Sequence, residues 1–164
     1  MTDLGAPKLG KSVQRSAIEP GHYYAVEAGG GFLIGFAGAV DDEPVFVILG
    51  KCDSFSSDNP PVWVLISAIP SEIYYELEDT VLLPAHTTGE GKLPAGELEA
   101  APRHGDLIED DTRRQFLFLA HKRDRRAFLI GDGRAWPEFD PVVVFRRWRL
   151  MQGGSLLCAF ESPK

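Results

Sequence analysis

The segment HYYAVEAGGGFLIGFAGAV, residues 22–40, holds two apolar runs, His22 to Glu27 and Phe32 to Val40, on either side of Ala28-Gly29-Gly30-Gly31. Both runs contain the aromatic and β-branched residues that favour strands. Glycine adopts the positive φ angles of a tight turn without steric cost. The segment therefore predicts a β-hairpin.

Similar strand-like runs follow the hairpin. A third run covers Val45 to Cys52, and a fourth covers Val62 to Ala68. Four such runs in succession predict a β-meander. Residues 71–83 fit either a helix capped by Ser71 or a strand, and the two adjacent tyrosines favour the strand.

The last third of the chain contains four more runs of this kind, at 115–121, 127–130, 141–150 and 156–160. Charged or glycine-containing turns separate them. We therefore expect a mainly β fold with little helix. Its strands would form an antiparallel meander of about eight or nine short members, arranged as a partly closed small barrel or a sandwich.

The chain is expected to form one β-rich domain, residues 21–164, after a flexible N-terminal tail, residues 1–20, that lacks hydrophobic periodicity. Residues 84–105 contain three prolines and four glycines. They predict one long loop, which is either mobile or functional.

The sequence also bears on location. No apolar run reaches the ~18 residues that a membrane-spanning helix needs, and residues 1–15 lack the apolar core of a secretory signal. Cys52 and Cys158 lie in or beside apolar runs and are expected to be reduced and buried, which favours a cytoplasmic location. A disulfide between the two cysteines is the alternative.

The charges are sorted along the chain. Residues 19–111 carry 18 acidic and 3 basic side chains, a formal balance of −15, whereas residues 112–150 carry 10 basic and 4 acidic side chains, a balance of +6. Such an asymmetric distribution influences the choice of partners and the rate of encounter more than it influences the fold.

Three acidic clusters lie at predicted turns or strand ends: residues 41–43, 76–79 and 109–111. Beside exposed tyrosines they suit docking to a basic protein, because opposite charge speeds the encounter and aromatic side chains anchor the complex. The alternative is a solvated surface. The predicted partner-binding residues are Glu76, Glu78, Asp79, Tyr74, Tyr75, Asp110 and Asp111, with Trp63 as a further anchor.

A competing interpretation is an enzyme or a small-ligand-binding protein with a polar site. Its candidate residues are His104, Asp106, Glu109 and His121. No two histidines lie three or four residues apart, so we expect no helical metal pair, no metal site and no cofactor.

Two further motifs bear on function. Residues 5–12 match the phosphate-binding pattern G-x-x-x-x-G-K-[ST], but only four residues precede them and Pro20 ends any following helix early, so the match is attributed to chance. The arginine-rich segment 112–150 suggests a nucleic-acid binder as another alternative. The net charge of −7 opposes binding to a polyanion, and we expect these arginines to pair with the acidic part of the chain instead.

Residues 19–36 combine a Pro-Gly turn, a strand, a glycine-containing hairpin and a second strand with an internal glycine, Gly35. This order resembles the opening of some bacterial immunity proteins from polymorphic toxin systems, over about 35 of the 164 residues. Those proteins usually have Asp after the first glycine, where this chain has His22. The resemblance implies a non-catalytic protein that neutralises a basic toxin or effector by covering its active site with complementary charge.

Overall fold

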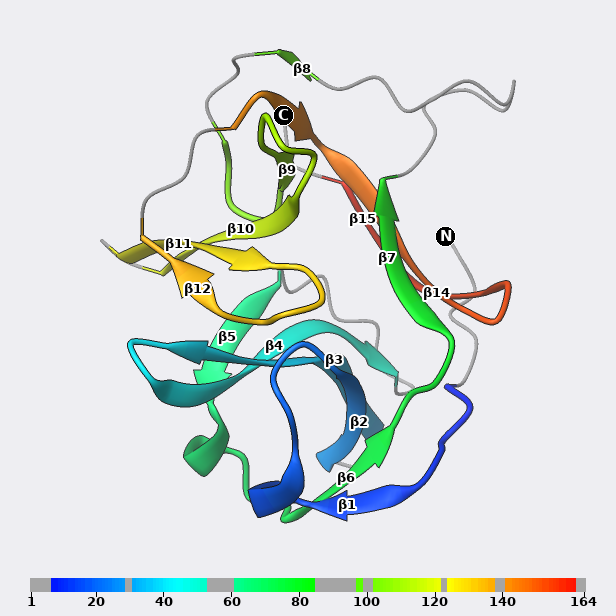
Figure 1. Cartoon of the computed structure of the whole chain (residues 1–164). Coiled ribbons are helices and arrows are strands. Elements are labelled where there is room, and N and C mark those ends of the chain that lie inside the picture. The colour runs from blue at the N-terminus through cyan, green and yellow to red at the C-terminus, as the bar shows by residue number, and fades with distance from the viewer. Residues whose placement is uncertain are drawn as a thin grey trace.

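The computed structural model describes residues 7–28, 31–52, 61–84, 97–98, 102–121, 124–137 and 141–161 (Figure 1). Its first sheet has six strands in the order β1-β6-β2-β3-β4-β5, and every ladder in it is antiparallel. The predicted hairpin and meander are confirmed as β2-β3-β4-β5. The strands are β1 (Ser12–Gln14), β2 (Tyr23–Ala28), β3 (Gly31–Val40), β4 (Glu43–Cys52), β5 (Val62–Leu65) and β6 (Ile73–Glu76).

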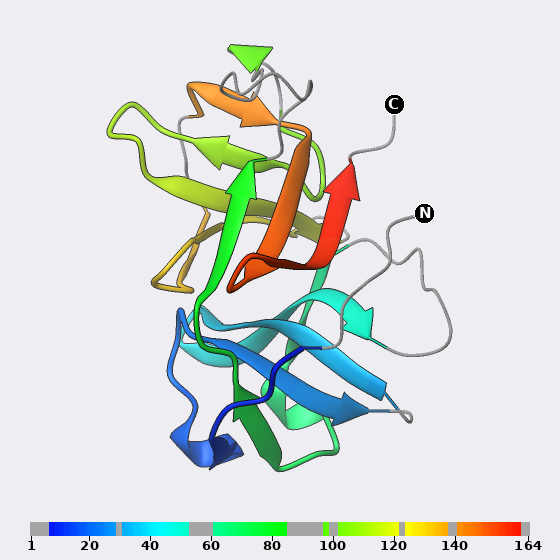
Figure 2. The same ribbon diagram turned by 90° about the vertical axis from the view of Figure 1, so that its right-hand side faces the viewer.

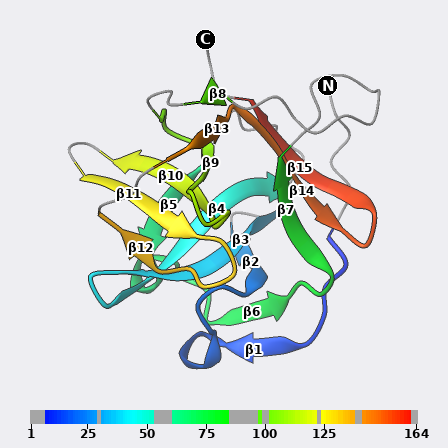
Figure 3. The ribbon, with the colours of Figure 1, turned by 45° about the horizontal axis from the view of Figure 1, so that its top comes forward.

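Two further sheets lie above the first one (Figure 2). The second sheet has the order β12-β11-β10-β9-β13-β8, and the third has the order β15-β14-β7. Figure 3 shows that β13 leads into β14 and so connects the two sheets. Their strands are β7 (Thr80–Pro84), β8 (Glu97–Leu98), β9 (Leu107–Glu109), β10 (Gln115–His121), β11 (Asp124–Leu129), β12 (Ala135–Trp136), β13 (Val143–Phe145), β14 (Arg147–Gln152) and β15 (Ser155–Glu161).

The structure confirms a mainly β, antiparallel fold with little helix. The described residues form fifteen strands, more than the eight or nine expected, and none of the three sheets closes into a barrel among them. Several of the additional strands have only two or three residues, too few for an alternating pattern to be recognised in a sequence.

Two predicted single strands are each divided between sheets. Residues 71–83 form β6 in the first sheet and β7 in the third, with a turn at Glu78 and Asp79, whose φ is 53°. Residues 141–150 likewise form β13 in the second sheet and β14 in the third, with Arg146 between them. In both cases the chain bends and changes its pairing partner, an event that side-chain alternation does not reveal.

Part of the expected N-terminal tail belongs to the fold. β1 pairs with β6, and Gly10 N–H donates a 2.8 Å hydrogen bond to the Glu76 carbonyl. The 3-10 turn η1 (Arg15–Ala17) follows β1. Most of the loop expected at 84–105 lies outside the described residues, apart from β8 and the segment that begins at residue 102.

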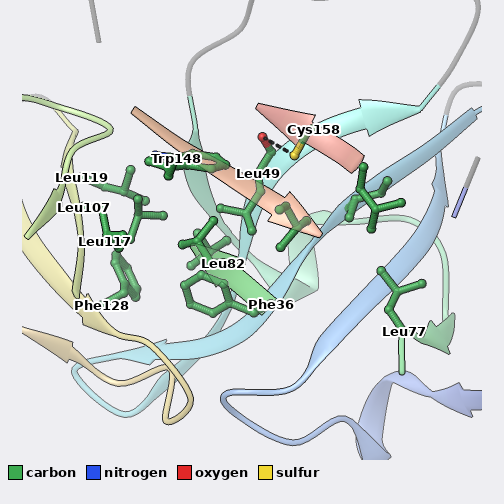
Figure 4. Packing of buried hydrophobic residues seen from close by; sticks show 14 of the residues in the cluster. Phe36, Leu49, Leu77, Leu82, Leu107, Leu117, Leu119, Phe128, Trp148 and Cys158 are labelled. Carbon is green, nitrogen blue, oxygen red and sulfur yellow. Dashed lines mark hydrogen bonds between the residues drawn. The ribbon is translucent and has the colours of Figure 1, made fainter. Parts of the chain in front are cut away.

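One hydrophobic cluster joins all three sheets (Figure 4). It contains Phe36 of the first sheet, Phe128 of the second, and Trp148 of the third. A second cluster lies on the opposite face of the first sheet, where Tyr24, Phe46 and Tyr74 pack beneath η1 and a second 3-10 turn, η2 (Ile66–Ala68). The first sheet is therefore covered on both faces.

Cys158 is a free, buried thiol in the first of these clusters, so it forms no disulfide with Cys52. Its Sγ atom lies 3.7 Å from the Leu49 carbonyl oxygen (Figure 4). Burial raises the pKa of this thiol to about 12. Within the described ranges, no helix has the length and apolar character that crossing a membrane requires.

Candidate functional site

The polar residues predicted near His104 belong to a tight turn before β9. Asp106 N–H donates a 2.9 Å hydrogen bond to the Arg103 carbonyl, and Gly105 has a φ of 92°. The His104 Nδ1 atom accepts a 2.8 Å hydrogen bond from Ala120 N–H. His104 therefore attaches the turn to β10, and this bond occupies one of its two ring nitrogens.

Asp106 is fully buried at the end of the same turn. Its carboxylate forms an ion pair with Arg146 and accepts a 2.7 Å hydrogen bond from Arg103 N–H. The Trp148 indole N–H donates a 2.8 Å bond to the Gly105 carbonyl beside it. The ion pair therefore connects the turn before β9 to Arg146, which lies between β13 and β14.

The structure describes no contact that brings Glu109 or His121, the other two candidates, into one cleft with Asp106. Glu109 accepts a long, 3.5 Å hydrogen bond from the Gln115 side chain across β9 and β10. His121 ends β10, and its side chain lies outside the described residues. Over the described part of the chain, no three His, Cys, Asp or Glu side chains are grouped so that they could hold a metal ion.

The predicted aromatic anchors occupy the core more than the surface. Tyr74, expected to be exposed, is fully buried, with ring centroids 6.2 Å from Tyr24 and 5.7 Å from Phe46. This expectation was wrong because Tyr74 faces the second cluster, whereas its neighbour Tyr75 faces the other side of the strand. Tyr75 is half-buried against Phe32, and Trp63 packs against Phe128.

Asp110 organises its own turn. Its carboxylate accepts hydrogen bonds from Thr112 N–H at 3.0 Å, Arg114 N–H at 2.9 Å and the Arg114 Nε–H at 3.0 Å. Desolvation raises the pKa of this carboxyl, but the hydrogen bonds from Arg114 and Thr112 together outweigh it and hold the pKa below its usual range. Asp110 thus has a structural task, while Asp111 beside it is exposed.

The remaining predicted residues lie around the connection between β6 and β7. Glu78 and Asp79 are exposed, and Glu76 is half-buried. Glu76 ends β6, and Glu78 and Asp79 follow it before β7 of the third sheet begins. We call the described residues between 7 and 79, which contain the first sheet, the first-sheet half of the molecule. Asp110 and Asp111 instead connect β9 and β10 of the second sheet. The predicted partner-binding residues therefore lie in two places: on β6 and the connection to β7, and in the turn between β9 and β10.

Ion pairing differs sharply between the two parts of the chain. In residues 102–161 most arginines pair with a carboxylate close in sequence or in the adjacent strand, as Arg134 does with Asp132 at 2.8 Å. Three described ion pairs join the arginine-rich segment 112–150 to the acidic residues 19–111: Arg114–Asp110 at 3.0 Å, Arg126–Asp41 at 3.0 Å, and Arg146–Asp106. The expected pairing is therefore present for these three arginines, and only the Arg126–Asp41 pair reaches the residues of the first sheet. The local pairs are Arg114–Asp110, Arg126–Asp124, Arg134–Asp132, Arg146–Asp106 and Arg147–Glu161.

Most acidic side chains of the first-sheet half form no ion pair with a described residue. Among the residues that the structure describes there, Glu72 pairs weakly with Arg15 at 3.9 Å and Glu19 contacts His22 at 3.2 Å. Six other carboxylates make no ion pair with any described residue. They are Glu27, Asp42, Glu43, Glu76, Glu78 and Asp79. We call these six the acidic set.

A groove of about 660 Å³ is lined by residues of η1, of η2 and of the segments beside them. Figure 1 draws these two turns as the blue and green coils at its bottom. Ile18 and Arg15 border it on one side and Leu65 and Ile66 on the other. Glu43 and Glu72 place carboxylates at the same groove. It combines apolar surface with negative charge and one arginine.

Two side-chain atoms of this part of the molecule are buried without a hydrogen-bond partner among the described residues: the Nε of Arg15, a residue that lines the groove, and the hydroxyl of Tyr74, which does not line it. Burial raises the pKa of Tyr74, and the positive charge of Arg15 opposes this change, which shows that the two groups are close. Sequence reasoning missed the groove because residues 1–20 were expected to be a tail. Ile18, an apolar residue just before the Pro-Gly turn, was the only local signal.

The geometry thus offers six carboxylates without described ion pairs, a groove that is partly apolar and partly acidic, and structural contacts at the predicted polar site. Comparison of the chain with models of protein families, with curated proteins and with solved structures found no match.

Proposed function

We propose that this chain is a non-catalytic protein-binding domain whose first-sheet half binds a basic partner. The observation that carries the proposal is the acidic set, six carboxylates without an ion pair among the described residues. Surface carboxylates that are not neutralised within the molecule create a negative potential, which attracts a positively charged protein and aligns it before contact.

The local pairing of the arginines supports the same proposal. Arg114, Arg146 and Arg147 already contact carboxylates, so they offer less charge to a phosphate backbone than their number suggests. The structural contacts of His104 and Asp106 favour binding over catalysis, because both side chains are engaged in holding a turn.

We further propose that the basic partner is a toxin or effector that this chain neutralises. The support is the resemblance of residues 19–36 to immunity proteins, together with the charge of the first-sheet half. Neutralisation by covering an active site requires complementary charge and a rigid surface, and it requires no reactive group. A β-sheet packed on both faces supplies such a surface.

The test uses the full chain as bait in a lysate of its native host at low salt, with elution by a salt step and mass spectrometry. The acidic variant carries Glu76→Lys, Glu78→Lys and Asp79→Asn, with asparagine chosen because residue 79 has a positive φ. The matched control carries Asp111→Lys, Glu161→Lys and Asp132→Asn, which changes the net charge equally on the other part of the molecule.

We expect one basic protein to be retained in stoichiometric amount by the wild type and by the control, and to be lost with the acidic variant. Its affinity for the wild type should fall as ionic strength rises, because salt screens exposed charges. Equal capture by all three proteins, or no capture by any of them, would overturn the proposal, provided that the three have the same thermal unfolding midpoint.

A further inference from the structure

A histidine side chain continues the ladder between β9 and β10. Beyond the last residue pair of these strands, Phe118 N–H donates a 2.8 Å hydrogen bond to the Asp106 carbonyl, and Gly105 N–H donates a 2.8 Å bond to the Phe118 carbonyl. The next donor of β10 on this side is Ala120 N–H, and its acceptor is the His104 Nδ1 atom, at 2.8 Å. The imidazole therefore takes the place of a backbone carbonyl at the end of the ladder.

This bond exists in only one charge state of the ring. A backbone N–H can only donate, so Nδ1 has to offer a lone pair, and the proton of the neutral imidazole lies on Nε2. A protonated imidazole carries a proton on both nitrogens and has no acceptor. The contact between His104 and Ala120 therefore breaks when the ring is protonated. Both residues are half-buried, so solvent can replace the lost partner.

The carboxylates near this contact pair with arginines. Asp106 pairs with Arg146, and Asp124 pairs with Arg126, so in the part of the chain that the structure describes neither carboxylate forms an ion pair with His104. Arginine keeps its charge over the range in which histidines ionise. The titratable and charged residues on the elements around the contact are Arg103 and Asp106 of the turn, His121 of β10, Asp124, Arg125 and Arg126 of β11, and Arg146 between β13 and β14.

The rest of the turn is held independently of the ring. The Gly105 carbonyl accepts a 2.8 Å bond from the Trp148 indole N–H, and the Asp106 carboxylate accepts a 2.7 Å bond from Arg103 N–H. None of these groups needs His104 as a partner. Breaking the histidine contact therefore releases the His104 side chain and the end of β10 at Ala120, while the turn stays in place.

We propose that His104 is a pH-dependent latch, which holds the end of β10 when its imidazole is neutral and releases it when the imidazole is protonated. Release leaves Ala120 N–H as a free backbone donor at the end of the strand and adds a positive charge to the turn beside it. The opening is local, because the backbone bonds of Gly105 and Phe118 do not titrate. The inference does not rest on the proposed function, since neither His104 nor Ala120 belongs to the acidic set.

The latch can be followed by NMR of the isotope-labelled full chain from about pH 8 to about pH 5, the range in which histidines ionise. At the upper end of this range, ring-nitrogen spectra should show the proton of His104 on Nε2. As the pH falls, the Ala120 amide signal should move with the same midpoint as the His104 ring, while those of Gly105 and Phe118 change little. An Ala120 signal that does not follow the ring, or a ring proton on Nδ1 at the upper pH, would overturn the inference.

Two substitutions separate protonation from loss of the side chain. The amide oxygen of asparagine can take the position of Nδ1 but does not titrate, so His104→Asn should keep the latch closed over the whole range. His104→Ala removes the acceptor, and its Ala120 amide should exchange with solvent about fivefold faster than in the asparagine variant at the same pH, the effect of losing one hydrogen bond. The wild type should match the asparagine variant at the upper pH and the alanine variant at the lower pH.

His121 requires its own control, because its titration beside Ala120 can shift the same amide signal. His121→Gln should leave the response of Ala120 to the His104 ring unchanged. An equal pH response of Ala120 in the wild type and in His104→Asn would assign the response to His121 and refute the latch. The wild-type titration decides the question even if His104→Ala fails to fold.

Discussion

At the scale of single residues, Gly105 shows how one backbone conformation holds several side chains. Its φ of 92° directs its carbonyl toward the Trp148 indole N–H, and a Cβ atom added at this position would overlap the Phe160 ring. Phe160 is stacked on Trp148, with ring centroids 5.3 Å apart. The positions of the turn, of Trp148 and of Phe160 therefore depend on residue 105 having no side chain.

We predict that Gly105→Ala lowers the free energy of unfolding by about 3 kcal/mol, of which about 1–2 kcal/mol comes from the positive φ and the rest from displacing Phe160. Gly131→Ala is the matched control, since Gly131 has a φ of 91° but nothing within 4 Å of an added Cβ. Urea unfolding measures both variants. Equal losses in the two proteins would show that Phe160 moves aside without cost.

Buried protons give a second prediction at this scale. Burial raises the pKa of Cys158 and of Tyr23 to about 12, from 9.0 and 10.0. The folded state therefore keeps these two protons at pH values at which the unfolded chain releases them. Above the pKa of the unfolded chain, rising pH favours the unfolded state. The free energy of unfolding should therefore fall as the pH rises from about 9 to 12, by about 1.4 kcal/mol per pH unit for each group at most.

Between pH 9 and 10 this loss comes mainly from the thiol, because the tyrosines begin to ionise in the unfolded chain only near pH 10. Urea unfolding at several pH values would measure it, with Cys158→Ala as the comparison. We expect the variant to be less sensitive to pH in this interval. The same slope in both proteins would refute the assignment to Cys158.

At the scale of elements, β1 and the residues before it make more contacts than the length of this strand suggests. β1 covers the edge of β6, and Val13 packs against the second cluster. Lys8 exchanges two hydrogen bonds with the Gln152 side chain, at 2.8 and 2.9 Å, and so ties this segment to β14. A segment without recognisable periodicity thus contacts two sheets.

We predict that a chain beginning at Arg15 is less stable than a chain beginning at Pro7 by about 3 kcal/mol. The estimate combines the partial burial of Val13 with about 1 kcal/mol for each of several backbone and Gln152 hydrogen bonds. Chemical unfolding of the two truncated proteins tests it. A difference within experimental error would mean that β1 contributes little to the free energy of unfolding.

The sequence predicts some elements of this fold and not others. The meander β2-β3-β4-β5 could be predicted because its turns are local and its apolar runs are long. The changes of sheet near Leu77 and Arg146 could not, because they depend on which strand across the molecule has a free edge. Tyr74 was misplaced for a related reason: strand alternation assigns Tyr74 and Tyr75 to opposite faces, but not to the core or the surface.

At the scale of the whole molecule, the acidic and arginine-rich parts of the chain meet through backbone contacts as well as charge. Ala39 N–H donates a 3.1 Å hydrogen bond to the Gly133 carbonyl, and a Cβ added to Gly38 would overlap that same carbonyl. Arg126 forms two hydrogen bonds with Asp41, at 3.1 and 3.0 Å, near this junction. Beneath it, the shared cluster joins Phe36 to Phe128, with ring centroids 6.4 Å apart.

We predict that the chain unfolds in one cooperative transition, because no part of this shared cluster can be exposed without exposing the rest. Tryptophan fluorescence and far-ultraviolet circular dichroism should then give the same midpoint. Gly38→Ala should lower both midpoints together, since the added Cβ separates the two halves at their backbone contact. If the substitution instead produces two separated transitions, the first sheet folds independently of the other two, and its acidic surface could be studied as an isolated unit.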